Sequence, residues 1–492
     1  MAYLLNVPLE VLLQITSYLT TPQYGHLRRT CKQLEALLFG AFAREFFSKR
    51  QFALVEFSLQ ALLDIAQSRL GPSLTHLIIH LERPYTSRIA TRFTSMTPRP
   101  IPAGKIAVQT NEFQAECISH QEFMATGQDV EMLSDAMKLL PNLETIGMRD
   151  FHSNHRSRDN TVWNSYGFPT FLERTGRPLE IPVVSRGPEY TGHVFLTILR
   201  AIGNAAVSGR STSDITRLEV LLHNCQISDL SFRIPSRFDA AISLALSKLT
   251  TMFLDNLGGE EPYILVGDVG GRTDPITGSG YFLSRFLAKA PNLERLRLNF
   301  QAYDHGSTRR FLSWLADVRE PPTDGTASPL GSLAAANASG SLPAHFPPTP
   351  KFPNLRYLDI GMATVTERIL LDLYRNYKST LQGISLHKII LEGTNEAKIN
   401  YWARLCNAIA KANLELKTFR LSYIKQKILG PPVRNCDVTF RGSRNKFVKD
   451  WRGTAFSQAI KDIIEDMESL WDDSDSEDDD ESMEDDDDDD MI

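Results

Sequence analysis

The 492-residue sequence contains only five cysteines, which are widely separated and include no Cys-x-x-Cys pair. This pattern excludes a disulfide-dense secreted scaffold and a zinc knuckle. No apolar run approaches the roughly 18 to 20 residues that a membrane-spanning helix needs. The apolar N-terminal stretch follows no basic residue and is interrupted by Glu10, so it does not resemble a signal peptide. We therefore expect a protein of the cytoplasm, the nucleus or both, with no membrane partner.

Lysine and arginine are absent from the C-terminal end, where residues 465–492 contain 18 acidic residues. The preceding sequence holds 41 acidic and 53 basic residues, so the net charge of −6 combines a basic body with an acidic tail. Neighbouring carboxylates lie within a Debye length of about 8 Å and repel each other, which predicts a disordered tail at residues 472–492. Three serines in this tail precede an acidic residue by three positions and resemble acidophilic-kinase sites: Ser474, Ser476 and Ser482.

Enzyme motifs are also missing. The glycine-rich stretch at residues 257–280 lacks the Gly-Lys-Ser/Thr of a phosphate-binding loop and the third glycine of a dinucleotide-binding turn. His152 and His155 could offer two metal ligands, but the polar loop that contains them offers no third. No Gly-x-Ser-x-Gly or His-Glu-x-x-His motif occurs. We expect no enzymatic activity, no cofactor and no bound metal.

The first 48 residues predict a helical hairpin followed by a third helix. Asn6 can cap the first helix, Pro8 is tolerated in its first turn, and Glu10 faces the positive end of its dipole. A lone core of this size is marginal, so part of its apolar surface must pack on the rest of the chain or on a partner. The apolar residues recur at spacings of three and four: Leu12, Ile15 and Leu19, then Tyr24, Leu27, Cys31, Leu34 and Leu38.

This segment resembles the F-box, a motif in which a Leu-Pro-x-Glu start leads to a helical hairpin that ends near a Cys-Lys/Arg pair. The matching residues are Val7-Pro8-Leu9-Glu10-Val11-Leu12, Ile15, Tyr18-Leu19, Leu27 and Arg28-Arg29-Thr30-Cys31-Lys32. The resemblance covers about residues 1–45, with Val7 in place of the usual leucine, and the stretch from Glu45 to Leu62 is similar to fungal F-box proteins. It implies docking on the adaptor of an SCF-type cullin–RING ubiquitin ligase, through Pro8, Leu9, Leu12, Ile15, Leu19 and Leu27.

The middle of the sequence repeats a six-residue pattern: apolar, two variable, apolar, one variable, apolar. Pro-Asn-Leu opens three of the units, far more often than composition alone predicts, and helical patterns precede most of them. Strand-like units that alternate with helices predict leucine-rich-repeat-like βα units. The units are Leu74/Leu77/Ile79, Leu143/Ile146/Met148, Leu218/Leu221/His223, Leu249/Met252/Leu254, Leu293/Leu296/Leu298, Leu355/Leu358/Ile360, Leu381/Ile384/Leu386 and Leu416/Phe419/Leu421.

The spacing of these units is irregular, from 26 to 75 residues, so the array must contain insertions and could form two blocks. We predict an α/β fold: a helical F-box, an irregular leucine-rich-repeat-like βα solenoid and a disordered acidic tail. The expected boundaries are 1–48 for the F-box, 49–130 for linker helices and a first unit, 131–425 for the repeats with a disordered insertion at 319–351, 426–471 for a basic segment and capping helix, and 472–492 for the tail.

The composition of the basic segment before the tail has two interpretations. Residues 417–461 hold 11 lysines and arginines and two acids, interleaved with aromatic residues, which is typical of a nucleic-acid surface and also of the solvated edge of a last repeat. The adjacent tail would compete with phosphate, so we expect no nucleic-acid partner.

We expect a substrate-recognition subunit of an SCF-type ligase, with the adaptor, and through it cullin, as partners together with an unidentified protein substrate. The alternative is a ligase-independent scaffold that binds histones or other basic proteins through its repeats and acidic tail.

Overall fold

The computed structural model describes residues 4–85, 103–152, 158, 160, 163–181, 187–208, 215–258, 280–300, 305–317, 348–394, 399–429 and 433–471. The acidic tail with its three serines, and all but the last four residues of the expected insertion at 319–351, lie outside these ranges. No helix in the described part of the chain is long and apolar enough to cross a membrane.

The N-terminal helices form at the predicted places, with different capping. Asn6 lies in a short 3-10 turn, and Pro8 is the N-cap of the first helix. Thr20 opens the second helix through a capping box with Gln23, whose Oε1 accepts a hydrogen bond from the Thr20 backbone N–H at 3.0 Å. Cys31 caps the third helix through its Sγ, 3.5 Å from the Leu34 backbone nitrogen. The helices are α1 (Leu9–Ser17), α2 (Thr21–Arg29) and α3 (Lys32–Phe47), preceded by η1 (Leu4–Asn6).

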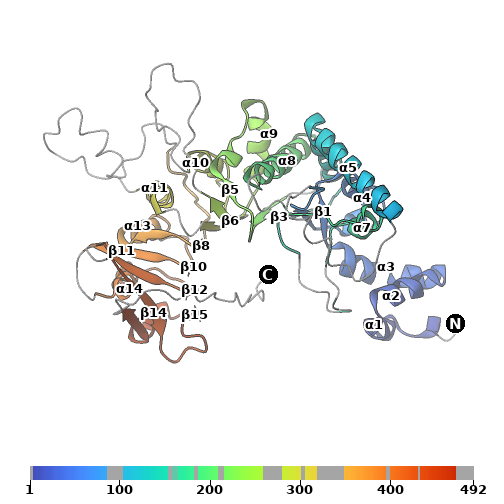
Figure 1. Cartoon of the computed structure of the whole chain (residues 1–492). Coiled ribbons are helices and arrows are strands. Elements are labelled where there is room, and N and C mark those ends of the chain that lie inside the picture. The colour runs from blue at the N-terminus through green and yellow to red at the C-terminus, as the bar shows by residue number, and fades with distance from the viewer. Residues whose placement is uncertain are drawn as a thin grey trace, which may run out of the picture.

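One long, curved sheet follows the N-terminal helices (Figure 1). Its strands are parallel along the order β1-β2-β3-β4-β6-β7-β8-β10-β12, and β15 joins the end of this row in the antiparallel direction. The repeats therefore form one continuous array rather than two blocks. Its strands are β1 (Lys49–Ala53), β2 (His76–His80), β3 (Thr145–Arg149), β4 (Arg217–Leu221), β6 (Thr251–Gly258), β7 (Arg295–Phe300), β8 (Tyr357–Gly361), β10 (Gly383–His387), β12 (Thr418–Ser422) and β15 (Val448–Arg452), with β5 (Ile227–Ser228) beside β6.

Helices cover the outer, convex side of this sheet, and the strands line its inner side (Figure 1). The N-terminal helices lie at one end of the arch, and the C-terminal strands lie at the other. The chain between β3 and α8 contains a helix, α7, which packs with α5 in a small second core around Phe113 and Phe171. The helices are α4 (Glu56–Gln67), α5 (Ala103–Thr126), α6 (Gln128–Lys138), α7 (Phe168–Thr175), α8 (Gly187–Val207), α9 (Ser236–Leu246), α10 (Tyr281–Leu287), α11 (His305–Leu315), α13 (Glu367–Asn376) and α14 (Tyr401–Lys411), with the 3-10 turns η2 (Gly71–Ser73) and η4 (Asp229–Phe232).

The C-terminal end of the array differs from the expectation. The capping helix predicted within residues 426–471 covers only Phe456–Glu465 and is followed by a strand that pairs back onto the chain. A second sheet, in the order β16-β14-β13-β11-β9, closes this end beside the main sheet. Its elements are β9 (Thr364–Thr366), β11 (Ile390–Thr394), β13 (Lys425–Leu429), β14 (Arg434–Phe440) and β16 (Met467–Trp471), with helix α15 (Phe456–Glu465) between β15 and β16.

The register of the main sheet explains the six-residue pattern. The first apolar residue of each unit lies before the strand, and the other two point to the helices. The third unit is a correction: Leu218 aligns with Ile146 and Met252, so the unit is Ile215/Leu218/Val220 rather than Leu218/Leu221/His223. One buried row therefore crosses the sheet: Leu77, Ile146, Leu218, Met252, Leu296, Leu358, Ile384 and Phe419.

The Pro-Asn-Leu tripeptide has a structural role in this array. The Nδ2 atom of Asn142 donates a hydrogen bond to the carbonyl of Pro72 at 2.7 Å, and Asn292 does the same to Ser247 at 2.7 Å. Each amide thus satisfies a carbonyl in the turn of the preceding unit, and the leucine that follows enters the core.

Substitution of Leu296 by alanine tests the importance of the buried row. Leu296 is fully buried, so Leu296→Ala should lower the free energy of unfolding by about 2 to 5 kcal/mol, measured by urea denaturation. The control Leu244→Ala removes the same atoms from an α9 side chain that is 45% exposed. It should change the free energy of unfolding by less than about 0.5 kcal/mol. Equal losses in the two variants would contradict this description of the core.

Candidate interaction surfaces

The N-terminal helices expose several large apolar side chains. Five large hydrophobic side chains in the first 40 residues are well exposed, although the same helices also bury a core of their own. Tyr18 is the extreme case, at 81% exposed. Exposed apolar side chains that gather in one small region mark an interaction site. The five are Leu9, Val11, Ile15, Tyr18 and Leu37.

The predicted adaptor contacts fall into three groups in the structure. Pro8, Leu9 and Ile15 are exposed, and Leu19 and Leu27 are partly buried. Leu12 is only 1% exposed and belongs to the core, so it is not available at the surface. Sequence reasoning did not select Val11, Tyr18 or Leu37, because a helical stripe alone does not show which of its members the neighbouring helix covers.

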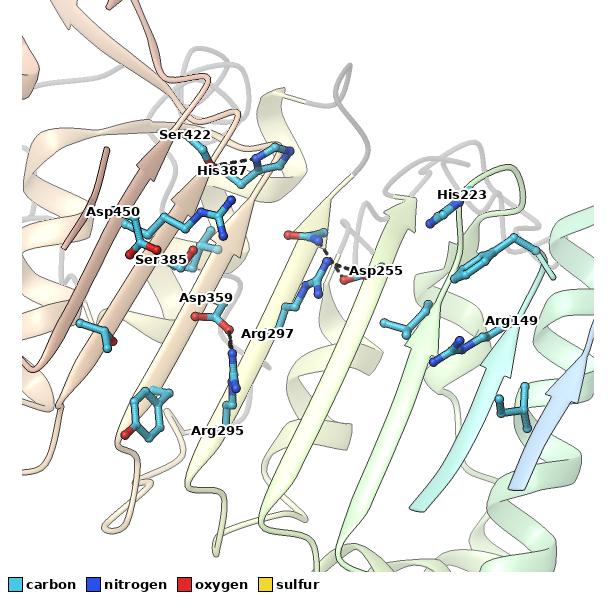
Figure 2. Close-up of a pocket in the computed structure, with 18 of the residues that line it drawn as sticks. Arg149, His223, Asp255, Arg295, Arg297, Asp359, Ser385, His387, Ser422 and Asp450 are labelled. Carbon is cyan, nitrogen blue, oxygen red and sulfur yellow. Dashed lines mark hydrogen bonds and ion pairs between the residues drawn. The ribbon is translucent and has the colours of Figure 1, made fainter. Parts of the chain in front are cut away.

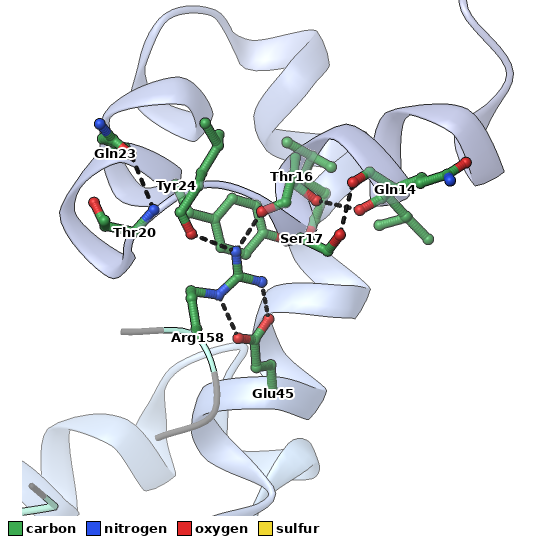
Figure 3. A network of polar contacts seen from close by, with 11 residues as sticks. Gln14, Thr16, Ser17, Thr20, Gln23, Tyr24, Glu45 and Arg158 are labelled. Carbon is green, nitrogen blue, oxygen red and sulfur yellow. Dashed lines mark hydrogen bonds and ion pairs between the residues drawn. The ribbon is translucent and has the colours of Figure 1, made fainter. Parts of the chain in front are cut away.

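Arg158 joins the N-terminal helices to the repeat body (Figure 3). Its Nε and Nη2 atoms lie 2.6 and 2.7 Å from the two carboxylate oxygens of Glu45 in α3. Its Nη1 atom donates to the carbonyls of Thr16 and Leu19 at the end of α1, the latter at 2.8 Å. The guanidinium also lies over the ring of Tyr24, at 4.8 Å. One side chain, 9% exposed, therefore binds carbonyls at the C-terminal end of α1 and fixes two helices to the segment after β3.

The inner face of the sheet forms the second surface, a hollow of about 830 Å³ (Figure 2). Its floor consists of the variable residues of the repeated pattern, which stand in rows because the strands are in register. Seven basic and four acidic side chains line it. The lining includes Arg149, Leu221, His223, Asp255, Arg295, Arg297, Asn299, Tyr357, Asp359, Ser385, His387, Arg420, Asp450 and Arg452.

Two acidic side chains of this face form ion pairs with arginines on neighbouring strands. Arg295 pairs with Asp359 at 3.1 Å, and Arg297 pairs with Asp255 at 3.1 Å (Figure 2). Asn299 adds a hydrogen bond of 2.9 Å to the same Asp255. Because the acids are engaged in these pairs and the bases outnumber them, the hollow presents a basic surface of fixed guanidinium groups.

Burial shifts the pKa values of several side chains on this face. It raises the pKa of Asp255 to about 6, against the opposing effect of Arg297. It also raises the pKa of Asp359, next to Arg295. Burial lowers the pKa of His387 to about 4, assisted by the positive charges of Lys388 and Arg297, so this imidazole is neutral at pH 7 and hydrogen-bonds to Ser422 at 2.9 Å. The face thus combines charged guanidinium groups with neutral hydrogen-bonding groups.

The basic C-terminal segment contributes to this same face rather than to a separate surface. Arg420 lies on β12, and Asp450 and Arg452 lie on β15, which pairs with β12. Phe440 is buried and Trp451 packs against the core, so the aromatic residues of this segment are largely structural. The structure therefore favours the edge of a last repeat over a stacking surface for nucleic acid.

Comparison with known proteins bears on the N-terminal helices. Residues 4–46 match the F-box-like family. The N-terminal helices form an F-box-like domain. The solved structures that the chain resembles include the leucine-rich repeat-containing protein LegL7 from Legionella pneumophila, at 11% identity and a TM-score of 0.24, over 84% of this chain and 97% of that one. No curated protein matches the sequence. The leucine-rich-repeat-like character of the body rests on its own sheet, in which parallel strands alternate with helices on one side.

Arg158→Ala should loosen the F-box-like domain from the body. The change leaves the Thr16 and Leu19 carbonyls and the Glu45 carboxylate without this donor, at a cost of about 1 to 3 kcal/mol. We expect faster amide hydrogen exchange in residues 9–47, measured by mass spectrometry, with the repeat strands unchanged.

Arg174→Ala provides the control, because Arg174 also pairs with glutamates but is 49% exposed. It should leave exchange in residues 9–47 unaltered. If residues 9–47 of the Arg158→Ala variant stay as protected from amide exchange as in the wild type, packing alone holds the domain in place.

Proposed function

We propose that this protein is the substrate-recognition subunit of an SCF-type cullin–RING ubiquitin ligase. The F-box-like domain binds the adaptor, and through it cullin, and the inner face of the repeat body binds a protein substrate. The chain supplies no catalytic residue; it acts by bringing a substrate lysine close to the charged conjugating enzyme. Such a protein works in the cytoplasm, the nucleus or both.

The exposed apolar surface of the F-box-like domain is the observation that carries this proposal. Leu9 and Ile15 are 41% and 40% exposed, and each buried aliphatic side chain contributes roughly 1.5 to 3 kcal/mol when a partner covers it. A domain that matches the F-box-like family and presents these side chains has the chemistry for adaptor docking.

The basic inner face supports the second half of the proposal. Strand residues such as Arg297 and Arg420 point into the hollow, away from the helices. Fixed guanidinium groups recognise carboxylates and phosphates by bidentate hydrogen bonds. The substrate segment that fits this face is therefore acidic, or made acidic by phosphorylation.

The double variant Leu9→Asp with Ile15→Asp tests adaptor binding. It places two carboxylates where two apolar anchors would be buried, so affinity for the purified SCF adaptor should fall at least about 100-fold, measured by isothermal titration calorimetry. The matched control is Leu139→Asp with Leu172→Asp, which changes two exposed leucines of the repeat body and should bind like the wild type. Unchanged adaptor affinity in the first variant would reject the assigned contact, and absence of binding by the wild type would favour the ligase-independent scaffold.

A further inference from the structure

Three side chains of metal-ligating type meet where β2 and β3 end. His80 is the last residue of β2, Glu82 follows it, and His152 lies just beyond β3. Their ligand atoms all lie within 4.8 Å of one another, and Nδ1 of His80 is 3.6 Å from Oε1 of Glu82. The two imidazole rings stack at a centroid distance of 4.7 Å. The sequence expectation considered only the loop around His152, whereas β2 and the residues after it bring two further side chains of ligating type next to it.

Hydrogen bonds compensate the burial of this cluster only in part: the Glu82 backbone N–H donates to Nδ1 of His80 at 3.3 Å, and the Glu82 side chain hydrogen-bonds to Ser165. His80 is fully buried and Glu82 is 2% exposed. Nε2 of His80 and Oε1 of Glu82 have no hydrogen-bond partner among the described residues. An unsatisfied buried polar atom costs about 1 to 3 kcal/mol, so two in one cluster point to a ligand that would satisfy them.

Gln51 contacts the third residue of the cluster: its Nε2 lies 3.4 Å from Nδ1 of His152 and 3.0 Å from Oγ of Ser165.

We propose that His80, Glu82 and His152 bind one divalent transition-metal ion, with zinc as the ion that this ligand set fits. Two imidazoles and one carboxylate form a zinc ligand set, with water free to complete a tetrahedron. Bonds of about 2.0 to 2.2 Å allow ligand atoms up to about 4.2 Å apart, so the widest separation has to close by about half an ångström. Because the two imidazole rings now stack, one ring also has to turn about its side-chain torsions so that both lone pairs point at the ion.

The proposed ion has a structural consequence. His152 and Arg158 belong to the same segment after β3, and Arg158 binds the F-box-like helices. An ion shared between β2 and His152 would tie the base of this segment to the sheet. The proposal does not depend on the ligase role.

Zinc binding to the full-length chain tests the proposal. After chelator treatment, the wild type should bind one Zn²⁺ by isothermal titration calorimetry, and Co²⁺ in the same site should give the visible absorption of tetrahedral coordination. Glu82→Gln and His152→Asn keep similar shapes but remove a ligand, and should each weaken Zn²⁺ binding at least about 100-fold. The control His223→Gln removes an exposed histidine that stacks on Phe151 at the same rim, and should bind Zn²⁺ like the wild type.

Two outcomes would overturn the proposal. One is absence of Zn²⁺ binding by the wild type at micromolar concentrations. The other is equal binding by all four chains, which would place the ion elsewhere, for example on the acidic residues after position 471. Circular dichroism checks the fold of each variant. If Glu82→Gln is unfolded, His152→Asn decides, because His152 is the least buried of the three.

Discussion

The alignment of one buried residue per strand across the main sheet is the constraint on which the rest of the structure depends. Side chains alternate between the two faces of a strand, so a shift by one residue would turn Leu296 outward and bring Arg295 and Arg297 into the core. The same register that builds the core therefore also builds the basic inner face. Insertions of very different lengths are tolerated because they leave from the ends of elements and do not alter the pairing of strands.

Local patterns made much of this fold predictable. The F-box-like helices and seven of the eight repeat units follow from spacing alone, because each is a short segment with one clear periodicity. The unit at β4 was misaligned, since Leu221 and His223 gave a nearly equivalent match to the pattern. Strand β1 was missed because Arg50 stands where other units have an apolar residue; its guanidinium packs over the rings of Phe47 and Trp163 instead.

The sites were less predictable because they depend on pairings between distant segments. Nothing in the sequence near Arg158 indicates that it contacts Glu45, which precedes it by more than a hundred residues. His80 and His152 come together only because β2 and β3 are adjacent and end at the same edge. The inner face could have been located from the variable positions of the repeated pattern, but its ion pairs required the strand order. A helical stripe likewise could not separate the exposed Ile15 from the buried Leu12.

The F-box-like domain lies at one end of a parallel array, so the place of a strand in the array sets its distance from that domain. Neighbouring strands lie about 4.8 Å apart, so each unit along the inner face is one such step farther from the domain. A segment held near β12 would lie eight strand spacings from β1, whereas one held near β4 would lie three. Gain or loss of a single unit between them would move a bound segment by one step while leaving both surfaces intact. The number of intervening strands therefore sets the distance between a segment bound on the inner face and the F-box-like domain.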